Sequence, residues 1–237
     1  MFDNVSFFVT TLLQGLLPTV IATVGGIVLA TLLSFGAGLA LLSSSRLVRG
    51  LSRTYVEFFR GTSELVQLFW IFFVLPVLVG FQLVPLFAGI VVLGLNHGAY
   101  GAEIVRGAVQ SVPRAQYEGC VALNLTPAQR MRRVILPQAV VEMLPPFNNL
   151  FIQLLKNSAL LSFISVADIS YLGTERLNVA FGDQSLLIYS LMLVFYLVLS
   201  LLITLVMRTL ERIGSARLGR GPSPMSQVPT TVDGGAR

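Results

Sequence analysis

Four polar side chains recur at helical spacing inside a largely apolar run: Asn149, Gln153, Lys156 and Asn157. In a helix these spacings place all four side chains on one face. Polar groups at membrane depth usually face a bundle interior or a cavity, because exposing them to lipid is costly. The lysine suits a solute carboxylate, and the amides suit the remaining polar groups of a solute. This pattern predicts a translocation pathway for a small polar solute.

A structural interpretation of the same residues stays open. Lys156 could pair with Glu103 or Glu142, or extend its ammonium group to the membrane surface, while the amides hold helices together. The single histidine, His97, is expected to be packed inside the bundle rather than to relay protons. Glu103 is expected to form a local ion pair with Arg106.

No catalytic or metal-binding motif accompanies these residues. Lys156 is the only lysine, and no glycine-rich turn precedes it, so a Walker-type phosphate loop is excluded. The single cysteine, Cys120, excludes an intrachain disulfide and a multi-cysteine metal site. No Ser/His/Asp set and no HExxH motif occurs. We therefore expect no catalytic residues, no metal and no enzyme activity in this chain alone.

Composition places these residues in a membrane. Of 237 residues, 54% are hydrophobic and only 11% are charged, whereas soluble domains carry roughly 25% charged residues. The first apolar run lacks a basic start and a cleavage site, so we expect it to remain as a span. The chain is expected to be an all-α integral membrane protein with about five transmembrane helices. The expected spans are Leu16–Leu42, Leu65–Phe81, Leu86–Val105, Leu144–Val166 (broken near its start by Pro145 and Pro146) and Ser185–Met207.

Arginine placement orients these spans. Fourteen of the sixteen basic residues follow spans one, three and five. The positive-inside rule makes those segments cytoplasmic, with the N-terminus outside and the C-terminus inside. The net charge of +5 is therefore attributed to topology and not to nucleic-acid binding. The expected organisation is an external segment (1–15), a transmembrane domain (16–213) and a disordered cytoplasmic tail (214–237) rich in Gly, Pro, Ser and Thr.

The segment 107–137, between the third and fourth spans, is expected to be an ordered cytoplasmic loop. Pro113 suits the first turn of a short helix, and Asn124 tolerates the left-handed conformation that ends one. Thr126 and Pro127 are strong signals for a second helix. A connector between antiparallel spans needs only a few residues. The length and helical signals of this loop predict a docking surface.

This loop resembles the "EAA" loop of ATP-binding-cassette (ABC) importer permeases. Glu118, Gly119 and Cys120 stand at the Glu-Ala-Ala positions, and Asn124 stands at the glycine position. "ILP" at 135–137 resembles the Ile-x-Leu-Pro ending without the intervening residue. "AYGAEIVRGAVQSVPRAQYEGCVALNLTPAQRMRRVILPQA", "FFRGTSELVQLFWIFFVLP" and "LLKNSALLSFISVADIS" resemble the polar amino-acid uptake branch of that family. The resemblance extends over residues 19–207.

The resemblance implies a coupling helix that sits in a groove of a separate ATPase subunit. The implied docking residues are Glu118, Gly119, Cys120, Asn124, Arg132 and Arg133. The implied location of this chain is the inner membrane. Its implied partners are an ATP-binding subunit, which binds the ATP, a second permease chain (a copy or a paralogue) and an extracytoplasmic solute-binding protein. No cofactor is implied for this chain itself.

The resemblance also bears on the solute. "ALNLTPAQR" and "RGTSELVQLFWIFFVLP" are most similar to permeases for ectoine and hydroxyectoine, whereas the wider branch handles polar amino acids. The alternative is a self-contained channel or an ion-coupled secondary transporter. Such transporters usually contain internal repeats, and none is visible in this sequence.

Overall fold

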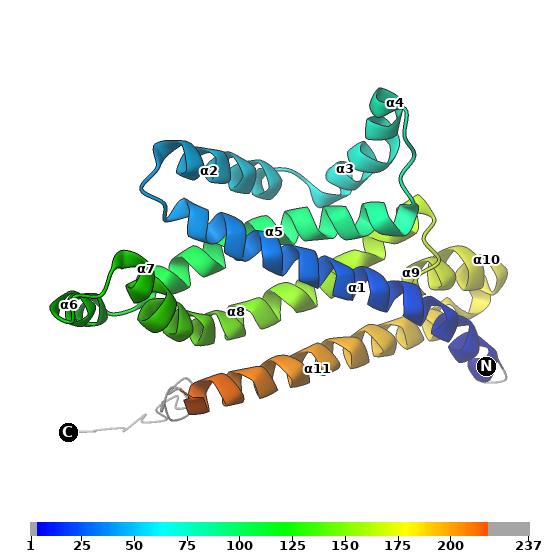
Figure 1. Cartoon of the computed structure of the whole chain (residues 1–237). Coiled ribbons are helices and arrows are strands. Elements are labelled where there is room, and N and C mark those ends of the chain that lie inside the picture. The colour runs from blue at the N-terminus through cyan, green and yellow to red at the C-terminus, as the bar shows by residue number, and fades with distance from the viewer. Residues whose placement is uncertain (1–3, 218–237) are drawn as a thin grey trace, which may run out of the picture.

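The computed structural model describes residues 4–217, and within this range every regular element is helical. Figure 1 shows long helices lying side by side, with short helices gathered at both ends of the bundle. The all-α prediction is therefore confirmed. The long helices are α1 (Val5–Leu41), α5 (Pro85–Ser111), α8 (Leu136–Asn157) and α11 (Ser185–Arg217).

The second expected span is a broken helix. α2 (Arg46–Gly61) is followed by α3 (Glu64–Phe69), η1 (Trp70–Val74) and α4 (Leu75–Val79), and the two halves meet at 104°. The prediction of one span at 65–81 was therefore incomplete, because α2 belongs to the same bent unit. Extended backbone at Thr62 and Ser63 makes the break.

The fourth expected span differs at its start. The helix begins at Pro127 and runs through α7 (Pro127–Arg130), η2 (Met131–Ile135), α8 and η3 (Ser158–Ile164). The predicted break at Pro145 and Pro146 was wrong, since both lie inside α8. Both prolines are on the exposed side of α8. Helix-interior prolines are tolerated at membrane depth where neighbouring groups replace the lost hydrogen bonds.

Short elements complete the two ends of the bundle. α6 (Arg114–Ala122) lies between α5 and α7. The opposite end holds α9 (Ile169–Tyr171), η4 (Leu172–Leu177), α10 (Asn178–Ala180) and η5 (Gly182–Gln184). α1 begins at Val5 instead of near Leu16, and α11 continues four residues into the expected tail. The rest of that tail, 218–237, lies outside the described residues.

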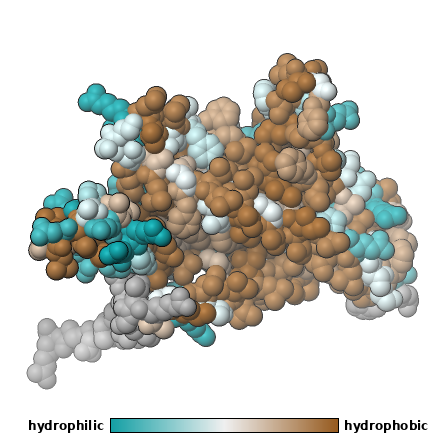
Figure 2. Space-filling view, viewed as in Figure 1, coloured by the Kyte–Doolittle hydropathy of each residue, from teal (hydrophilic) through white to brown (hydrophobic). Residues whose placement is uncertain are grey.

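The surface fits a membrane environment. Figure 2 shows a broad apolar band across the molecule, with hydrophilic residues collected toward its two ends. α1 and the helix Gly182–Ala216 are each long and apolar enough to cross a membrane. Two further pairs of helices, each bent at a short break, meet the same criteria of length and apolarity when the two helices of a pair are counted as one span. α5, with 27 residues, is about 40 Å long and also exceeds the thickness of the hydrocarbon core.

Small residues bring α1 and α5 into close contact. A Cβ at Gly94 would meet Leu29 at 2.5 Å, and a Cβ at Gly101 would overlap Ser34 Oγ. The Ser34 hydroxyl donates to the Ala30 carbonyl at 2.6 Å, so its polar group is satisfied inside the bundle. Close backbone approach at small residues is a common way for membrane helices to associate without a hydrophobic driving force.

A glycine on α1 provides the first prediction. Gly15→Ala should destabilise the chain, because its Cβ would lie 2.6 Å from the backbone of Asp168 and Ile169. Overpacking typically costs about 1–3 kcal/mol. Thermal unfolding in detergent micelles measures the effect. Gly36→Ala, in the same helix with nothing within 4 Å, is the matched control and should unfold no earlier than the unsubstituted chain. Equal melting temperatures for the two variants would contradict this packing.

Candidate functional site

The short helix α6 is held against the end of α5. The Tyr117 hydroxyl donates to the Val109 carbonyl at 3.1 Å, and the Cys120 side chain is buried. Partial burial raises the pKa of Tyr117, while the positive charge of Arg130 opposes that shift. The phenol therefore stays a neutral hydrogen-bond donor at physiological pH. These two contacts fix the orientation of α6.

The turn after α6 follows the sequence signals. Asn124 has φ 53°, in the left-handed region, as predicted. The Thr126 side chain accepts from the Gln129 amide at 3.3 Å, and the Gln129 side chain accepts from the Thr126 amide at 3.0 Å. This reciprocal capping box, with Pro127 in the first turn, confirms the predicted second helix.

The expected docking residues separate into two groups. Glu118 and Gly119 are exposed on α6, and Arg132 and Arg133 are exposed on η2. A cleft of about 530 Å³ is lined by the two arginines together with Ala128 and Gln129. Cys120 instead points inward and supports α6. The surface that a partner could touch is thus made by α6 and by the first turns after Thr126.

The polar residues of α8 also separate. Asn149, Gln153 and Lys156 are exposed, whereas Asn157 is half-buried and donates to Glu64 Oε2 at 2.6 Å. Among the ion pairs of the described residues Glu103 pairs with Arg106, so the alternative pairing of Lys156 with Glu103 is not adopted.

Two expectations about α5 are confirmed. Glu103 pairs with Arg106 at 2.6 Å. The His97 side chain is 1% exposed and is packed inside the bundle.

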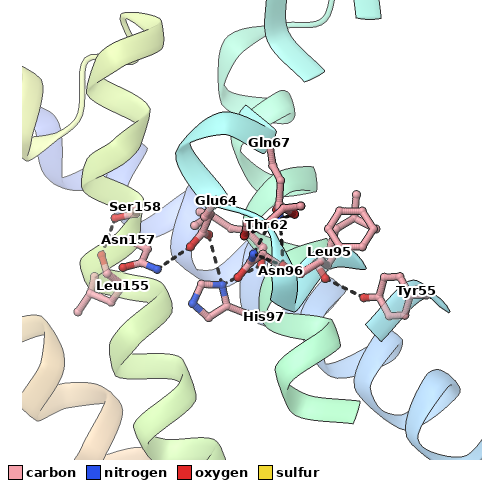
Figure 3. Close-up of polar contacts among 12 residues, drawn as sticks. Tyr55, Thr62, Glu64, Gln67, Leu95, Asn96, His97, Leu155, Asn157 and Ser158 are labelled. Carbon is pink, nitrogen blue, oxygen red and sulfur yellow. Dashed lines mark hydrogen bonds and ion pairs between the residues drawn. The ribbon is translucent and has the colours of Figure 1, made fainter. Parts of the chain in front are cut away.

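A buried polar cluster joins three elements at the break between α2 and α3. It consists of Glu64, Gln67, Asn96, His97 and Asn157, shown in Figure 3. The carboxyl oxygen Glu64 Oε1 lies 3.4 Å from His97 Nδ1. The Asn96 amide donates to Gln67 Oε1 at 3.1 Å. α3, α5 and α8 are thus connected through side chains at one depth of the bundle.

The same cluster holds the break itself. The Asn96 and Gln67 amides both donate to the Phe59 carbonyl, at 3.0 Å, near the end of α2. Gln67 also donates to Thr62 Oγ1 at 2.7 Å. The Phe59 carbonyl, which the break leaves without a helical donor, is therefore satisfied by two side chains, as buried backbone groups require.

Sequence reasoning missed Glu64 as a functional candidate. A usable signal was present, because a carboxylate opens the apolar run that follows "RGTS". Among residues 4–217, no three His, Cys, Asp or Glu side chains gather as a metal site would need. The chemistry available in the cluster is hydrogen bonding and charge recognition.

Comparison with known proteins agrees with this architecture. The family model described as "binding-protein-dependent transport system inner membrane component" matches residues 22–213. The chain is 44% identical over 183 residues to a protein of Sinorhizobium fredii named "Probable amino-acid ABC transporter permease protein y4tF", covering 75% of this chain and 76% of that one. It is 35% identical over 195 residues to the Escherichia coli glutamine transport system permease protein GlnP, covering 82% and 86%.

Solved structures show the same fold. A chain of "an amino acid ABC transporter with histidines" superposes with a TM-score of 0.80 at 30% identity, covering 90% of this chain and 98% of that one. A chain of the MetNI methionine ABC transporter in an inward-facing conformation superposes with a TM-score of 0.73 at 22% identity, covering 86% and 96%. The chain, a multi-pass inner-membrane protein, therefore belongs to the family of binding-protein-dependent transport system inner membrane components.

Proposed function

We propose that this chain is the permease subunit of an ATP-driven importer for a small zwitterionic solute, of the polar amino-acid class. The observation that carries the proposal is the 44% identity to a probable amino-acid ABC transporter permease over three quarters of both chains. The Bacillus subtilis relative TcyB, 34% identical over 84% of this chain, is named an L-cystine permease. These names support the amino-acid class without selecting one member of it.

The proposed ATPase docking surface is connected to the buried polar cluster by one long helix. An ATPase subunit would dock on α6 and on the exposed Arg132 and Arg133. The helix that begins at Pro127 continues to Asn157, a distance of about 45 Å at 1.5 Å per residue. A displacement at the docking surface would therefore reach the buried polar cluster through one continuous element. A second permease chain and an external solute-binding protein complete the proposed importer.

Within the zwitterion class, we propose ectoine and hydroxyectoine as the solutes to test first. This finer proposal is supported by the resemblance of "ALNLTPAQR" and "RGTSELVQLFWIFFVLP" to permeases of those solutes. Both compounds carry a carboxylate, as amino acids do, so the same polar groups could serve either.

Uptake by cells tests the proposal. The gene is deleted and restored, and accumulation of radiolabelled ectoine, arginine, histidine, glutamine and cystine is compared. Loss of one solute on deletion, with recovery on restoration, is the expected result. Loss of an amino acid without loss of ectoine removes the finer proposal only. Unchanged accumulation of all five, with no ATPase subunit co-purifying, would overturn the importer proposal.

Lys156 gives a prediction about the translocation pathway. Lys156→Met should reduce uptake about tenfold, because the exposed ammonium is the only lysine charge available to meet a solute carboxylate. Radiolabelled uptake at equal membrane level measures the effect. Lys156→Arg keeps the charge and should retain most of the uptake. Wild-type uptake by the Met variant would show that the solute does not use this charge.

A further inference from the structure

A charged pocket lies between α2 and α5, apart from the buried polar cluster. Its volume is about 490 Å³, and six charged residues line it: Arg49, Arg53, Arg60, Arg106, Glu57 and Glu103. We call it the arginine pocket. Two ion pairs lie along its walls, Arg53 with Glu57 at 2.7 Å and Arg106 with Glu103 at 2.6 Å.

The other two arginines carry uncompensated charge. Within residues 4–217, neither Arg49 nor Arg60 forms an ion pair with a carboxylate. Arg49 donates to the Ser43 carbonyl at 3.1 Å, and the Arg60 guanidinium lies 5.2 Å from the centre of the Tyr100 ring. The pocket therefore offers two guanidinium groups to an anion and places two carboxylates nearby.

The position of the pocket on α2 separates it from lipid. Leu47, Leu51 and Phe58 are exposed on one flank of the helix, and their apolar side chains suit contact with lipid. Arg49, Arg53 and Arg60 lie at helical spacing on the opposite flank. A charged flank that turns away from lipid must face water or a polar partner.

A polar face of α5 connects the pocket with the buried polar cluster. Asn96 belongs to the cluster, and Tyr100, Glu103 and Gln110 follow at helical spacing on the same face. From Asn96 to Gln110 this face extends about 21 Å along the helix axis. Tyr100 also contacts Arg60, so α2 follows the same face. The break between α2 and α3 lies at the Asn96 end of this face, where Asn96 donates to the Phe59 carbonyl. Irregular backbone at membrane depth is tolerated where it lines a cavity.

From these contacts we propose that the arginine pocket is a release site, which receives the carboxylate of the transported solute on its cytoplasmic side. The inference rests on the proposed import function. Arg49 or Arg60 would bind the carboxylate, one at each end of the pocket, because the two residues lie about 16 Å apart along α2. A planar guanidinium group matches a carboxylate in a bidentate manner. Glu57 and Glu103 would face the ammonium group of a zwitterion. The exposure of these side chains keeps binding weak, which a release site needs because the solute must leave.

Transport by the assembled importer in proteoliposomes tests the role of the charges. The solute is whichever member of the uptake panel the wild-type importer accumulates. Arg49→Gln with Arg60→Gln should lower uptake at saturating solute about fivefold, without reducing recovery of the complex. Arg46→Gln is the matched control, because Arg46 is an exposed arginine of the same helix that does not line the pocket. Equal rates in both preparations would overturn the release site.

Thiol labelling tests occupancy directly. Gln110→Cys places an exposed thiol on the pocket wall, whereas the native Cys120 is buried and stays unchanged. A sulfonate-bearing methanethiosulfonate should react about fivefold faster than a trimethylammonium one, and loss of both arginines should abolish that preference. Millimolar transported solute should slow the reaction, whereas its analogue with an amide in place of the carboxylate should not.

The two ideas fail in different ways. An importer that accumulates its solute but shows no solute protection at position 110 overturns the release site alone. Accumulation of none of the panel solutes overturns the import function, and the release site with it.

Discussion

Gly119→Trp is expected to abolish uptake while the chain still folds and inserts. A Cβ at Gly119 meets nothing within 4 Å, and the position is exposed on α6. The indole would therefore disturb no contact inside this chain but would occupy the space that a docked ATPase needs. We expect co-purification of the ATPase subunit to fall at least tenfold, because close approach to a small residue cannot tolerate an added ring.

Gly50→Trp is the matched control for this experiment. Gly50 is also a helical glycine that is exposed and has nothing within 4 Å, but it lies on α2, away from the proposed docking surface. The control should retain the ATPase and most of the uptake. If Gly119→Trp keeps its ATPase at the control level, α6 is not the docking surface, whatever the resemblance of its sequence.

Glu64→Leu is the second variant with a large expected effect. Its carboxylate accepts from Asn157 at 2.6 Å and lies 3.4 Å from His97. Leucine would leave the half-buried amide donor of Asn157 without its acceptor, at a cost of about 1 kcal/mol, the low end of the usual range. It would also release the end of α3 from α8. We expect uptake to fall about tenfold, measured at equal membrane level.

Glu64→Gln separates the hydrogen bond from the charge. Glutamine keeps an oxygen that can accept from Asn157, so uptake near the wild-type level would assign the effect to the hydrogen bond. Asn157→Leu alone and combined with Glu64→Leu completes a double-mutant cycle. Because the two residues are in contact, the double variant should lose much less than the sum of the single losses. Strict additivity would show that they act independently.

Local sequence signals predicted the turn between α6 and α7 well. Asn124 adopts the left-handed conformation, and Thr126 forms the capping box with Gln129. Both outcomes depend on groups within three residues of one another, so the sequence contains all the interacting parts. The local pair of Glu103 and Arg106, three residues apart, was predictable for the same reason.

Other features depended on neighbours that a sequence does not identify. Pro145 and Pro146 predicted a break in the helix, but α8 continues through both residues. The break occurs instead at Thr62 and Ser63, where Gln67 and Asn96 supply hydrogen bonds to the Phe59 carbonyl. Asn96 is 37 residues from Phe59, so nothing in the local sequence indicates that this partner is available.

Membrane class, helical content and family could all be derived from the order of the amino acids, because composition, apolar run length and short motifs report on each segment separately. Two contacts could be found only in the packed bundle. Glu64 meets Asn157, 93 residues away, and arginines of α2 share a pocket with α5. The reason is physical. Spacing along one helix gives the face on which a residue lies, whereas its partner depends on which helices pack against that face, and packing is a property of the whole bundle.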